Sequence, residues 1–150
     1  MLILSWLIAL AVTGSLLDAL NGGRRIRNLF DITPRPTGPL VSIIVAARNE
    51  AHGIESGVRS LLALSYPALE VIVVNDRSTD STGAILDRVR QEDPRLIVVT
   101  VDRLPPGWLG KNHALAVGAA TSHGSLLLFT DADIVFDPST IGRAVAVIED

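Results

Sequence analysis

Two aspartates, Asp131 and Asp133, interrupt an otherwise apolar run at residues 126–136. Carboxylates one residue apart can face a common cation if the backbone turns between them. Mg²⁺ is often held by one or two carboxylates together with substrate phosphates and water. A pair of this kind is equally typical of a solvated loop in which an aspartate caps the next helix. The pair indicates a Mg²⁺ or Mn²⁺ site only if other polar groups converge on it.

Asp76 lies at the end of another apolar run, in the segment "NDRSTD" at residues 75–80. A carboxylate at that point can accept hydrogen bonds from a nucleobase N–H or from a ribose hydroxyl. Ser78 or Asp80, further along the segment, is better placed to cap a following helix. We therefore expect Asp76 to bind a ligand and the rest of the segment to be structural.

Lys111 follows two glycines in the segment "PPGWLGK" at residues 105–111. Glycine allows close backbone approach, and free N–H groups at a helix amino end together with a lysine can bind a diphosphate. An ordinary surface turn with an exposed lysine is the alternative. Trp108 could pack against the core or stack on a ligand.

The elements that must position these residues alternate between two patterns. Continuous apolar runs, rich in β-branched residues, are typical of strands covered on both faces. They occur at residues 40–47, 70–75, 95–101 and 125–130, and helical patterns occur at residues 54–62, 85–89 and 111–121. A fourth helix is predicted to begin at Asp137, with Pro138 in its first turn. This alternation predicts an α/β fold with a mostly parallel sheet and helices on both faces.

Ligands of such sheets bind beyond the carboxyl ends of the strands. The segments that follow the four predicted strands are "ARNEAHG", "NDRSTD", "DRLPPGWLGK" and "DAD". The polar residues described above all fall in these segments. We therefore expect them to meet at one edge of the sheet.

The first part of the chain has a different character. Residues 1–17 carry no charged side chain, and residues 1–20 approach the roughly 20 residues that cross a bilayer. Arg24, Arg25 and Arg27 follow, which favours a cytoplasmic location for the rest of the chain. The sequence predicts a transmembrane anchor at 1–20, a basic and proline-rich linker at 21–39 and a domain at 40–150. The expected location is the cell membrane, with a single-pass anchor and the domain on the cytoplasmic side.

Composition excludes several other classes. The chain has 150 residues, no cysteine and a formal net charge of -3. Disulfide scaffolds and thiolate metal sites are excluded, and nucleic acid is not an expected partner. The three histidines, at 52, 113 and 123, have no regular metal-ligand spacing, and the first strand is not followed by G-x-G-x-x-G.

Four segments in this order and spacing resemble the family 2 glycosyltransferases, which have the GT-A fold. They are "VSIIVAARNE", "YPALEVIVVNDRSTDST", "PPGWLGKNHALAVG" and "LLLFTDADIVF". The resemblance covers about residues 40–150, and the "PPGWLGK" segment is most similar to the membrane-associated bacterial branch linked to hopanoids and carotenoids. It implies an incomplete GT-A domain that binds a nucleotide-diphosphate sugar, often a UDP-sugar, with Mg²⁺ or Mn²⁺. The sugar would be transferred with inversion to a lipid or membrane-proximal acceptor.

The resemblance also assigns roles to residues. Asp76 would contact the uracil or ribose, and Lys111 would lie near the base or the diphosphate. Asp131 would face the ribose or metal-bound water, and Asp133 would ligate the metal, with Asp131 as the second candidate ligand. The residues implied in nucleotide-sugar binding are Ala46, Arg48, Glu50, Asp76, Lys111 and Asp131.

Two features leave alternatives open. The chain ends at Asp150 within a helical pattern, so we expect a truncated domain whose catalytic base lies beyond that residue. A membrane-anchored nucleotide-binding module without catalysis is then one alternative. The run ending in Asp131 and Asp133 also resembles that of haloacid-dehalogenase-like phosphatases, with Asp131 as nucleophile and Asp133 as acid/base. That motif normally follows the first strand of the domain, whereas three predicted strands precede it here.

Overall fold

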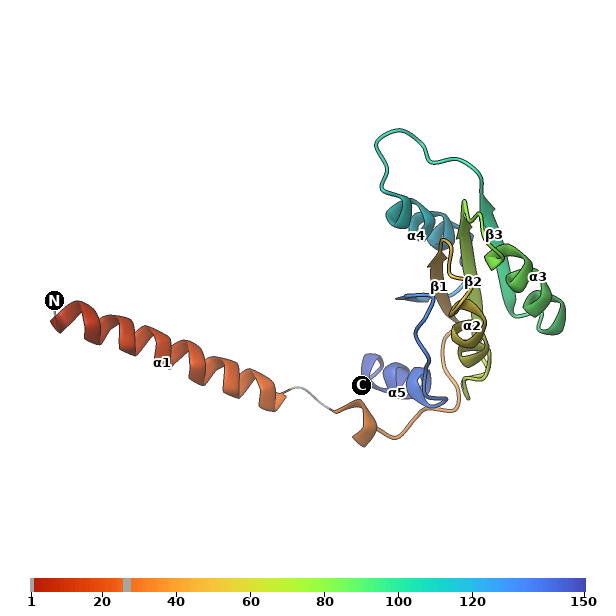
Figure 1. Cartoon of the computed structure of the whole chain (residues 1–150). Coiled ribbons are helices and arrows are strands. Elements are labelled where there is room, and N and C mark those ends of the chain that lie inside the picture. The colour runs from red at the N-terminus through yellow and green to blue at the C-terminus, as the bar shows by residue number, and fades with distance from the viewer. Residues whose placement is uncertain (1, 26–27) are drawn as a thin grey trace. The chain divides into compact units, whose positions relative to one another are not determined.

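The computed structural model describes residues 2–25 and 28–150, and the side chains of residues 2–4, 7 and 20–25 are not among those described. The chain forms two compact units, Met1–Ile32 and Thr33–Asp150. The first unit contains helix α1 (Leu2–Arg25) and the short 3-10 helix η1 (Leu29–Asp31), and Figure 1 shows both. The second unit contains the sheet and all other helices.

Helix α1 presents large apolar side chains to solvent. Those described are Trp6, Ile8, Leu10, Val12, Leu16 and Leu17, each more than half exposed. Within the part of the chain that the structure describes, no helix is long and apolar enough to cross a membrane. The transmembrane anchor predicted at residues 1–20 is therefore not supported by the structure. Part of that range, Met1 and the side chains of residues 2–4 among it, lies outside the described residues.

The second unit contains one four-stranded sheet with the order β3-β2-β1-β4, in which every described pairing is parallel. Its strands are β1 (Val41–Ala47), β2 (Leu69–Asp76), β3 (Leu96–Val101) and β4 (Leu126–Thr130). Its helices are α2 (Ile54–Leu62), α3 (Thr82–Glu92), α4 (Gly110–Thr121) and α5 (Thr140–Ile148). The predicted parallel α/β sheet is confirmed, and each strand begins and ends within one residue of its predicted bounds.

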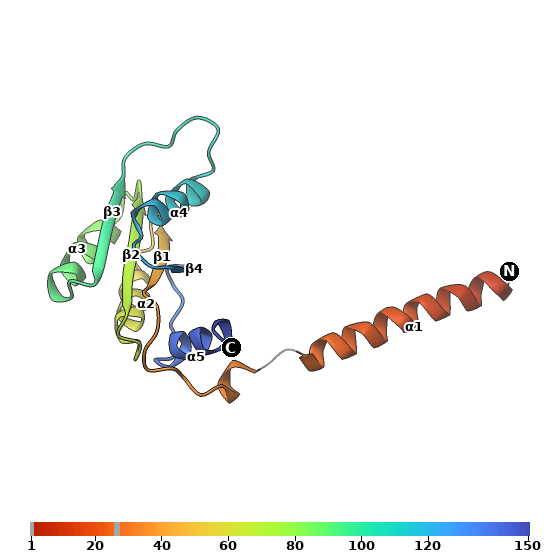
Figure 2. The same cartoon turned by 180° about the vertical axis from the view of Figure 1, so that it is seen from behind.

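Helices cover both faces of the sheet. Helices α2, α3 and α5 pack on one face and α4 packs on the other, as Figures 1 and 2 show from opposite sides. Alternate residues of each central strand therefore enter different cores. Ile43 and Val71 face α2 and α3, whereas Ile44 and Ile72 face α4, and all four are fully buried. This two-sided burial explains the continuous apolar runs of the sequence.

Two local features differ from the predictions. Helix α5 begins at Thr140, and the Asp137 carboxylate accepts hydrogen bonds from the N–H and hydroxyl of Ser139 in the turn before the helix. Residues 33–39, predicted as linker, belong to the second compact unit. The Arg35 N–H donates to the Gly142 carbonyl (2.9 Å), and the Tyr66 hydroxyl donates to the Pro39 carbonyl (2.6 Å).

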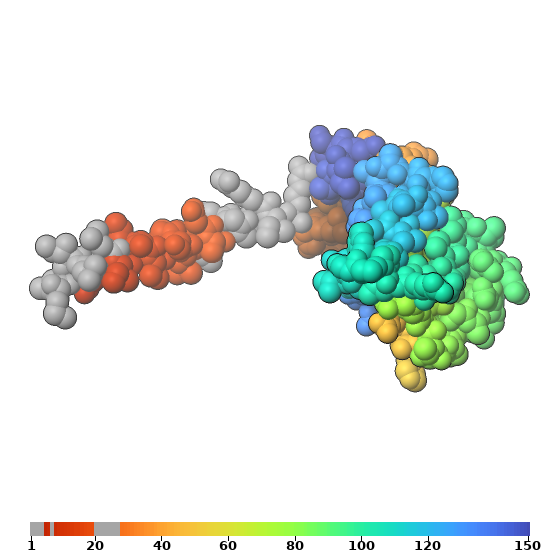
Figure 3. All heavy atoms as spheres, turned by 90° about the horizontal axis from the view of Figure 1, so that it is seen from above, coloured from red at the N-terminus to blue at the C-terminus, as the bar shows by residue number. Residues whose placement is uncertain are grey.

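The parallel arrangement brings four connections to the carboxyl edge of the sheet. They are residues 48–53 after β1, 77–81 after β2, 102–109 after β3 and 131–139 after β4. The connection between β3 and α4 arches above the strand ends in Figure 1 and faces the viewer in Figure 3. The fold thereby gathers the polar residues of the sequence at one edge, as predicted.

Candidate functional site

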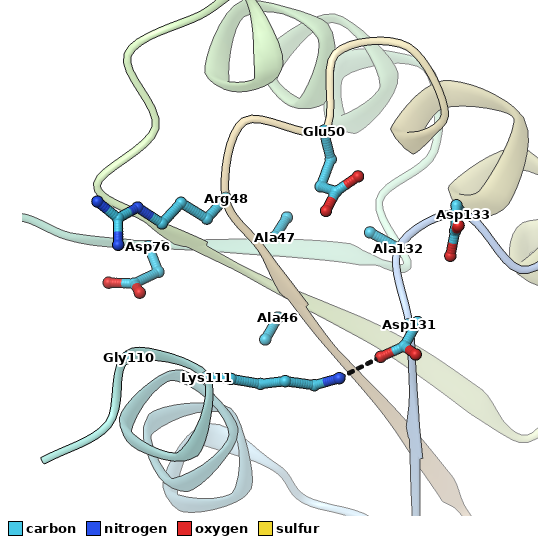
Figure 4. Close-up of a pocket in the computed structure, with 10 residues that line it drawn as sticks. All are labelled: Ala46, Ala47, Arg48, Glu50, Asp76, Gly110, Lys111, Asp131, Ala132 and Asp133. Carbon is cyan, nitrogen blue, oxygen red and sulfur yellow. Dashed lines mark hydrogen bonds and ion pairs between the residues drawn. The ribbon is translucent and has the colours of Figure 1, made fainter.

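A pocket of about 460 Å³ lies at the carboxyl edge of the sheet. Its lining contains every residue that the sequence analysis assigned to nucleotide-sugar or metal binding. The lining residues are Ala46, Ala47, Arg48, Glu50, Asp76, Gly110, Lys111, Asp131, Ala132 and Asp133. In Figure 4, Arg48 and Asp76 lie at one end, Asp131 and Asp133 lie at the other, and Glu50 lies between them.

Asp76 is the buried acid of the pocket, with a side chain that is 4% exposed. Its Oδ1 accepts a hydrogen bond from Arg77 Nε (2.8 Å), and its Oδ2 accepts one from Arg77 Nη2 (2.9 Å). These hydrogen bonds, with the nearby charges of Arg48 and His113, outweigh the effect of burial and hold the pKa of Asp76 below its usual value. This end of the pocket therefore presents an ionised carboxylate, which can only accept hydrogen bonds.

Asn49 joins the connections after β1 and β2 by hydrogen bonds. Its backbone N–H donates to Ser78 Oγ (3.0 Å), and its Oδ1 accepts from the Thr79 N–H (2.8 Å). Asn49 has a φ of 57°, in the left-handed region where asparagine is better tolerated than most residues. Ser78 is thus occupied by the neighbouring connection and does not cap α3.

Asp80 also links the connection after β1 to the start of α3. Its Oδ1 accepts from the N–H and hydroxyl of Thr82, the first residue of α3, and its Oδ2 accepts from the Ala51 N–H (3.1 Å). These bonds hold the pKa of Asp80 below its usual value, with the Thr82 hydroxyl as the main cause. Thr82 Oγ1 in turn accepts from the Glu50 N–H (2.9 Å), which fixes the backbone of a pocket residue. Asp80 is structural, as predicted, and it also supports the connection after β1.

Lys111, in the first turn of α4, reaches across the pocket to Asp131, the residue that follows β4. Its Nζ donates to Asp131 Oδ1 at 2.5 Å, drawn as the dashed line in Figure 4. The hydrogen bond and charge of Asp131 raise the pKa of Lys111, so the ammonium form is favoured. Both side chains are more than half exposed, so the pair remains accessible to a ligand.

Helix α2 fixes the backbone that carries the aspartate pair. A Cβ atom on Gly57 would lie 2.2 Å from the carbonyl oxygen of Ala132, which only glycine avoids. A Cβ on Gly53 would lie 3.2 Å from the Cβ of Asp133. Ala132 is buried, whereas Asp131 and Asp133 on either side of it are exposed to the pocket. The two carboxylates are therefore held by a buried residue between them.

The carboxylate oxygens of the pocket fit a magnesium or manganese ion that a substrate phosphate also helps to bind. Among residues 2–25 and 28–150, no group of three His, Asp or Glu side chains could hold a metal alone. Asp131 and Asp133 nevertheless line one pocket and offer carboxylate oxygens, the ligands that Mg²⁺ prefers. Because Mg²⁺ is usually completed by substrate phosphates and water, two carboxylates suffice. The residues fit such an ion when a diphosphate accompanies it.

The remaining wall of the pocket comes from the amino end of α4. A Cβ on Gly110 would lie 2.9 Å from both Arg77 Nη2 and Asp76 Oδ2. One turn further on, the His113 ring meets Trp108 edge to face at 5.4 Å. Among the described residues, His113 Nδ1 is buried without a hydrogen-bond partner. Trp108 is thereby placed beside the pocket wall, although it does not line the pocket.

Sequence reasoning missed Arg77 and Gly57. Nothing in "NDRSTD" distinguishes Arg77 from an exposed surface residue, because its role depends on a backbone φ of 55°. The sequence did contain a sign of Gly57, since a glycine inside an apolar helical pattern costs about 1 kcal/mol relative to alanine.

The whole arrangement, a doubly covered parallel sheet with acidic and basic side chains around one pocket at its carboxyl edge, is that of α/β domains whose ligands bind beyond the carboxyl ends of the strands. Residues 42–150 match the model of the glycosyl transferase family 2, so the chain belongs to this family. The match favours this assignment over the phosphatase alternative for Asp131 and Asp133.

Two curated relatives illustrate the family. The chain is 36% identical over 156 residues to a beta-monoglucosyldiacylglycerol synthase of Synechocystis, covering 94% of this chain and 30% of the relative. It is 35% identical over 96 residues to the 4,4'-diaponeurosporenoate glycosyltransferase of Staphylococcus aureus, covering 64% of this chain and 24% of the relative. The chain thus spans less than a third of the length of either relative.

Two solved structures share the fold. The mannosyltransferase PcManGT from Pyrobaculum calidifontis, in complex with GDP-Man and Mn²⁺, matches with a TM-score of 0.71 and 32% identity, over 95% of this chain and 44% of that one. S. aureus TarS 1-349 in complex with UDP-GlcNAc matches with a TM-score of 0.63 and 28% identity, over 73% of this chain and 31% of that one. Both confirm the GT-A type of fold.

Proposed function

We propose that the protein is the donor-binding part of a glycosyltransferase that transfers a sugar from a nucleotide-diphosphate sugar, a UDP-sugar in our assignment. The observation that supports this most directly is the convergence of Asp76, Lys111 and Asp133 on one pocket. Asp76 is the last residue of β2, Lys111 lies in the first turn of α4 and Asp133 follows β4, and the parallel topology brings them together. The two similar solved structures are complexes with GDP-Man and with UDP-GlcNAc, which supports the donor class.

In this proposal the nucleoside occupies the end of the pocket that contains Arg48 and Asp76. The ionised Asp76 accepts hydrogen bonds from N–H or O–H groups of the base or ribose. Arg48 and Glu50 line the adjacent wall. The sugar diphosphate then extends toward Lys111, whose ammonium group offsets part of its negative charge.

Asp133 would hold the Mg²⁺ or Mn²⁺ ion, with Asp131 as the second carboxylate. When bound, the ion stabilises the negative charge that develops on the departing diphosphate. Lys111 pairs with Asp131, the second carboxylate of the proposed metal site. Its ammonium group would therefore move from Asp131 toward the phosphates as the nucleotide sugar binds. The exposure of both side chains supports this exchange, because an exposed ion pair contributes only about 0–1 kcal/mol and no other described group holds the lysine.

Transfer with inversion requires a general base that removes the proton of the acceptor hydroxyl. We assign no residue of this chain to that role, and we expect the base in the part of the longer relatives that the chain does not span. A chain that binds the donor without transferring the sugar is the expected behaviour of the 150 residues by themselves.

We further propose a lipid or membrane-proximal acceptor. The names of the two curated relatives specify a diacylglycerol lipid and a carotenoid acid. The exposed apolar side chains of α1 provide a surface that lipid could cover. The location at the cytoplasmic side of the cell membrane stays a prediction, and cosedimentation of the chain with vesicles of anionic phospholipid would test it.

Calorimetric titration of the full chain with UDP or GDP, in Mn²⁺ or in EDTA, tests the proposal. We expect Mn²⁺-dependent binding of UDP that is weakened about tenfold or more in Asp133→Asn, because even the loss of a residue that only orients a metal ligand typically lowers metal affinity by about 10–100-fold. Asp87→Asn is the matched control, since Asp87 is exposed on α3 and does not line the pocket. Absence of nucleotide binding, or equal losses in both variants, would contradict the proposal.

A further inference from the structure

Arg77 is not part of the pocket lining, yet it holds the buried carboxylate of the pocket in a fixed position. Its Nε and Nη2 donate to the two different oxygens of Asp76, at 2.8 and 2.9 Å. This is the two-pronged geometry in which the planar guanidinium matches a carboxylate. The Arg77 side chain is 24% exposed and that of Asp76 is 4% exposed, so the pair is largely shielded from water.

The backbone of Arg77 is arranged for this contact. Its φ of 55° lies in the left-handed region, which is unfavourable for a residue with a Cβ atom. In this conformation the guanidinium lies beside the carboxylate of the preceding residue. The Arg77 N–H donates to the Val101 carbonyl at 3.1 Å, which anchors the turn to the end of β3.

Gly110 closes the other side of the pair. A Cβ atom there would lie 2.9 Å from Arg77 Nη2 and 2.9 Å from Asp76 Oδ2. Three segments, the end of β2, the end of β3 and the start of α4, therefore fix one ion pair at the nucleoside end of the pocket. A surface ion pair of ordinary kind would need no such enclosure.

We propose that Arg77 is a positioning residue for nucleoside recognition, whose guanidinium fixes the plane of the Asp76 carboxylate and leaves one acceptor position on each oxygen for the ligand. Each carboxylate oxygen has two lone pairs, and Arg77 uses one of them. A fixed, acceptor-only carboxylate selects ligand groups that donate a hydrogen bond. The inference rests on the proposed function, because it specifies how the donor-binding pocket recognises its nucleoside.

Arg77 also keeps the carboxylate ionised. The other charged groups that act on Asp76 are Arg48, from the connection after β1, and His113, from α4. Both favour the ionised form more weakly than the hydrogen bonds of Arg77 do. Removal of Arg77 takes away the largest of the causes that lower the pKa of Asp76 and leaves burial, which raises it, so that pKa should rise relative to wild type. Protonated Asp76 would itself donate one hydrogen bond. It would then no longer select ligand groups that donate hydrogen bonds.

The test compares Arg77→Gly, Arg77→Lys and the control Arg103→Gly, all in the full chain. Glycine accepts the left-handed backbone, so Arg77→Gly removes the guanidinium without adding strain. Arg103 is exposed in the connection after β3 and does not line the pocket. Two measurements are made on each variant: the titration of the Asp76 carboxyl carbon by ¹³C NMR, and UDP binding in Mn²⁺ by calorimetry from pH 5 to 8.

We expect the titration of Asp76 to move to higher pH in Arg77→Gly. We also expect its UDP affinity, relative to wild type at the same pH, to fall about tenfold for each pH unit below the raised pKa. Arg77→Lys should restore part of the affinity, and Arg103→Gly should behave as wild type. A purely structural role would lower affinity equally at every pH.

An unchanged Asp76 titration in Arg77→Gly, or an unchanged pH profile of UDP binding, would overturn the inference. Failure of the proposed function has a different signature. In that case wild type would bind neither UDP nor GDP, while the Asp76 titration would still respond to the loss of Arg77.

Discussion

The main-chain oxygen of Ala132 lies only 2.2 Å from the position that a Cβ atom on Gly57 would occupy. Helix α2 and the segment that carries Asp131 and Asp133 therefore touch through their backbones. Because carbonyl oxygen cannot move aside as a flexible side chain can, this contact fixes the height of the aspartate pair above the sheet.

Gly57→Ala should displace the aspartate pair. Alanine favours a helix over glycine by about 1 kcal/mol, but overpacking against backbone costs about 1–3 kcal/mol. We expect a net loss of stability in urea unfolding, together with weaker Mn²⁺-dependent UDP binding. Gly14→Ala is the control, because a Cβ there meets nothing within 4 Å. Unchanged UDP binding in Gly57→Ala would show that the segment can adjust.

Asp80→Ala should lower the free energy of unfolding by about 1–2 kcal/mol, as the loss of a helix cap does. The variant loses the bonds to Thr82 and also the bond to the Ala51 N–H. Urea denaturation measures the effect, with Asp87→Ala on the exposed face of α3 as the control. Equal effects of the two substitutions would mean that the bonds of Asp80 add nothing to stability.

Acid should destabilise the end of the sheet opposite the pocket. Burial alone would raise the pKa of Glu70, but hydrogen bonds from Ser42 Oγ (2.6 Å) and the His123 N–H (2.6 Å) outweigh it and hold that pKa below its usual value. A carboxyl group with a lowered pKa stabilises the fold above its unfolded pKa, about 4.3 for glutamate, and loses this contribution as the pH falls through the folded value.

We therefore expect the free energy of unfolding to fall between about pH 5 and pH 3, and to fall less steeply in Glu70→Gln. Chemical denaturation at a series of pH values measures both slopes. Glu55→Gln serves as the control, because Glu55 pairs with arginines on the exposed faces of α2 and α3. Identical slopes in wild type and Glu70→Gln would refute the assignment.

Lys111→Met should separate binding from stability. The Lys111–Asp131 pair is exposed, and exposed ion pairs contribute about 0–1 kcal/mol, so unfolding should hardly change. UDP binding should weaken, because the variant removes the ammonium group that offsets the negative charge of the diphosphate in our proposal. Arg90→Met breaks a comparable exposed pair with Asp87, away from the pocket, and should leave binding intact. Calorimetry on both variants decides; tighter UDP binding in Lys111→Met would mean that the lysine competes with the ligand for Asp131.

The sheet could be predicted closely because its strands are covered on both faces. Runs such as residues 40–47 and 70–75 have no polar face and end where polar connections begin. The convergence of Asp76, Lys111, Asp131 and Asp133 followed from topology, since parallel strands bring their carboxyl ends to one edge, whereas Ala46, Arg48 and Glu50 were assigned from the family resemblance. Neither prediction needed the position of any side chain.

Contacts within the site could not be predicted, because they depend on backbone angles and on close approach between distant segments. The ion pair of Asp76 and Arg77 requires a left-handed turn at an arginine, which sequence patterns disfavour. The pairing of Lys111 with Asp131 links α4 to the connection after β4, and no sequence motif predicts it. Asp137 looked like a helix cap, but its carboxylate turns to Ser139 and the helix begins later.

Strand β1 is bonded on both sides, since Val41 pairs with Leu69 of β2 and also with Leu126 of β4. The second pairing joins residues far apart in the chain, and contacts of large sequence separation form slowly. As the chain emerges from a ribosome, β1 and β2 can pair long before β4 has been synthesised. We expect the aspartate pair to reach its final position only after β4 has paired with β1, so the order of synthesis delays completion of the pocket.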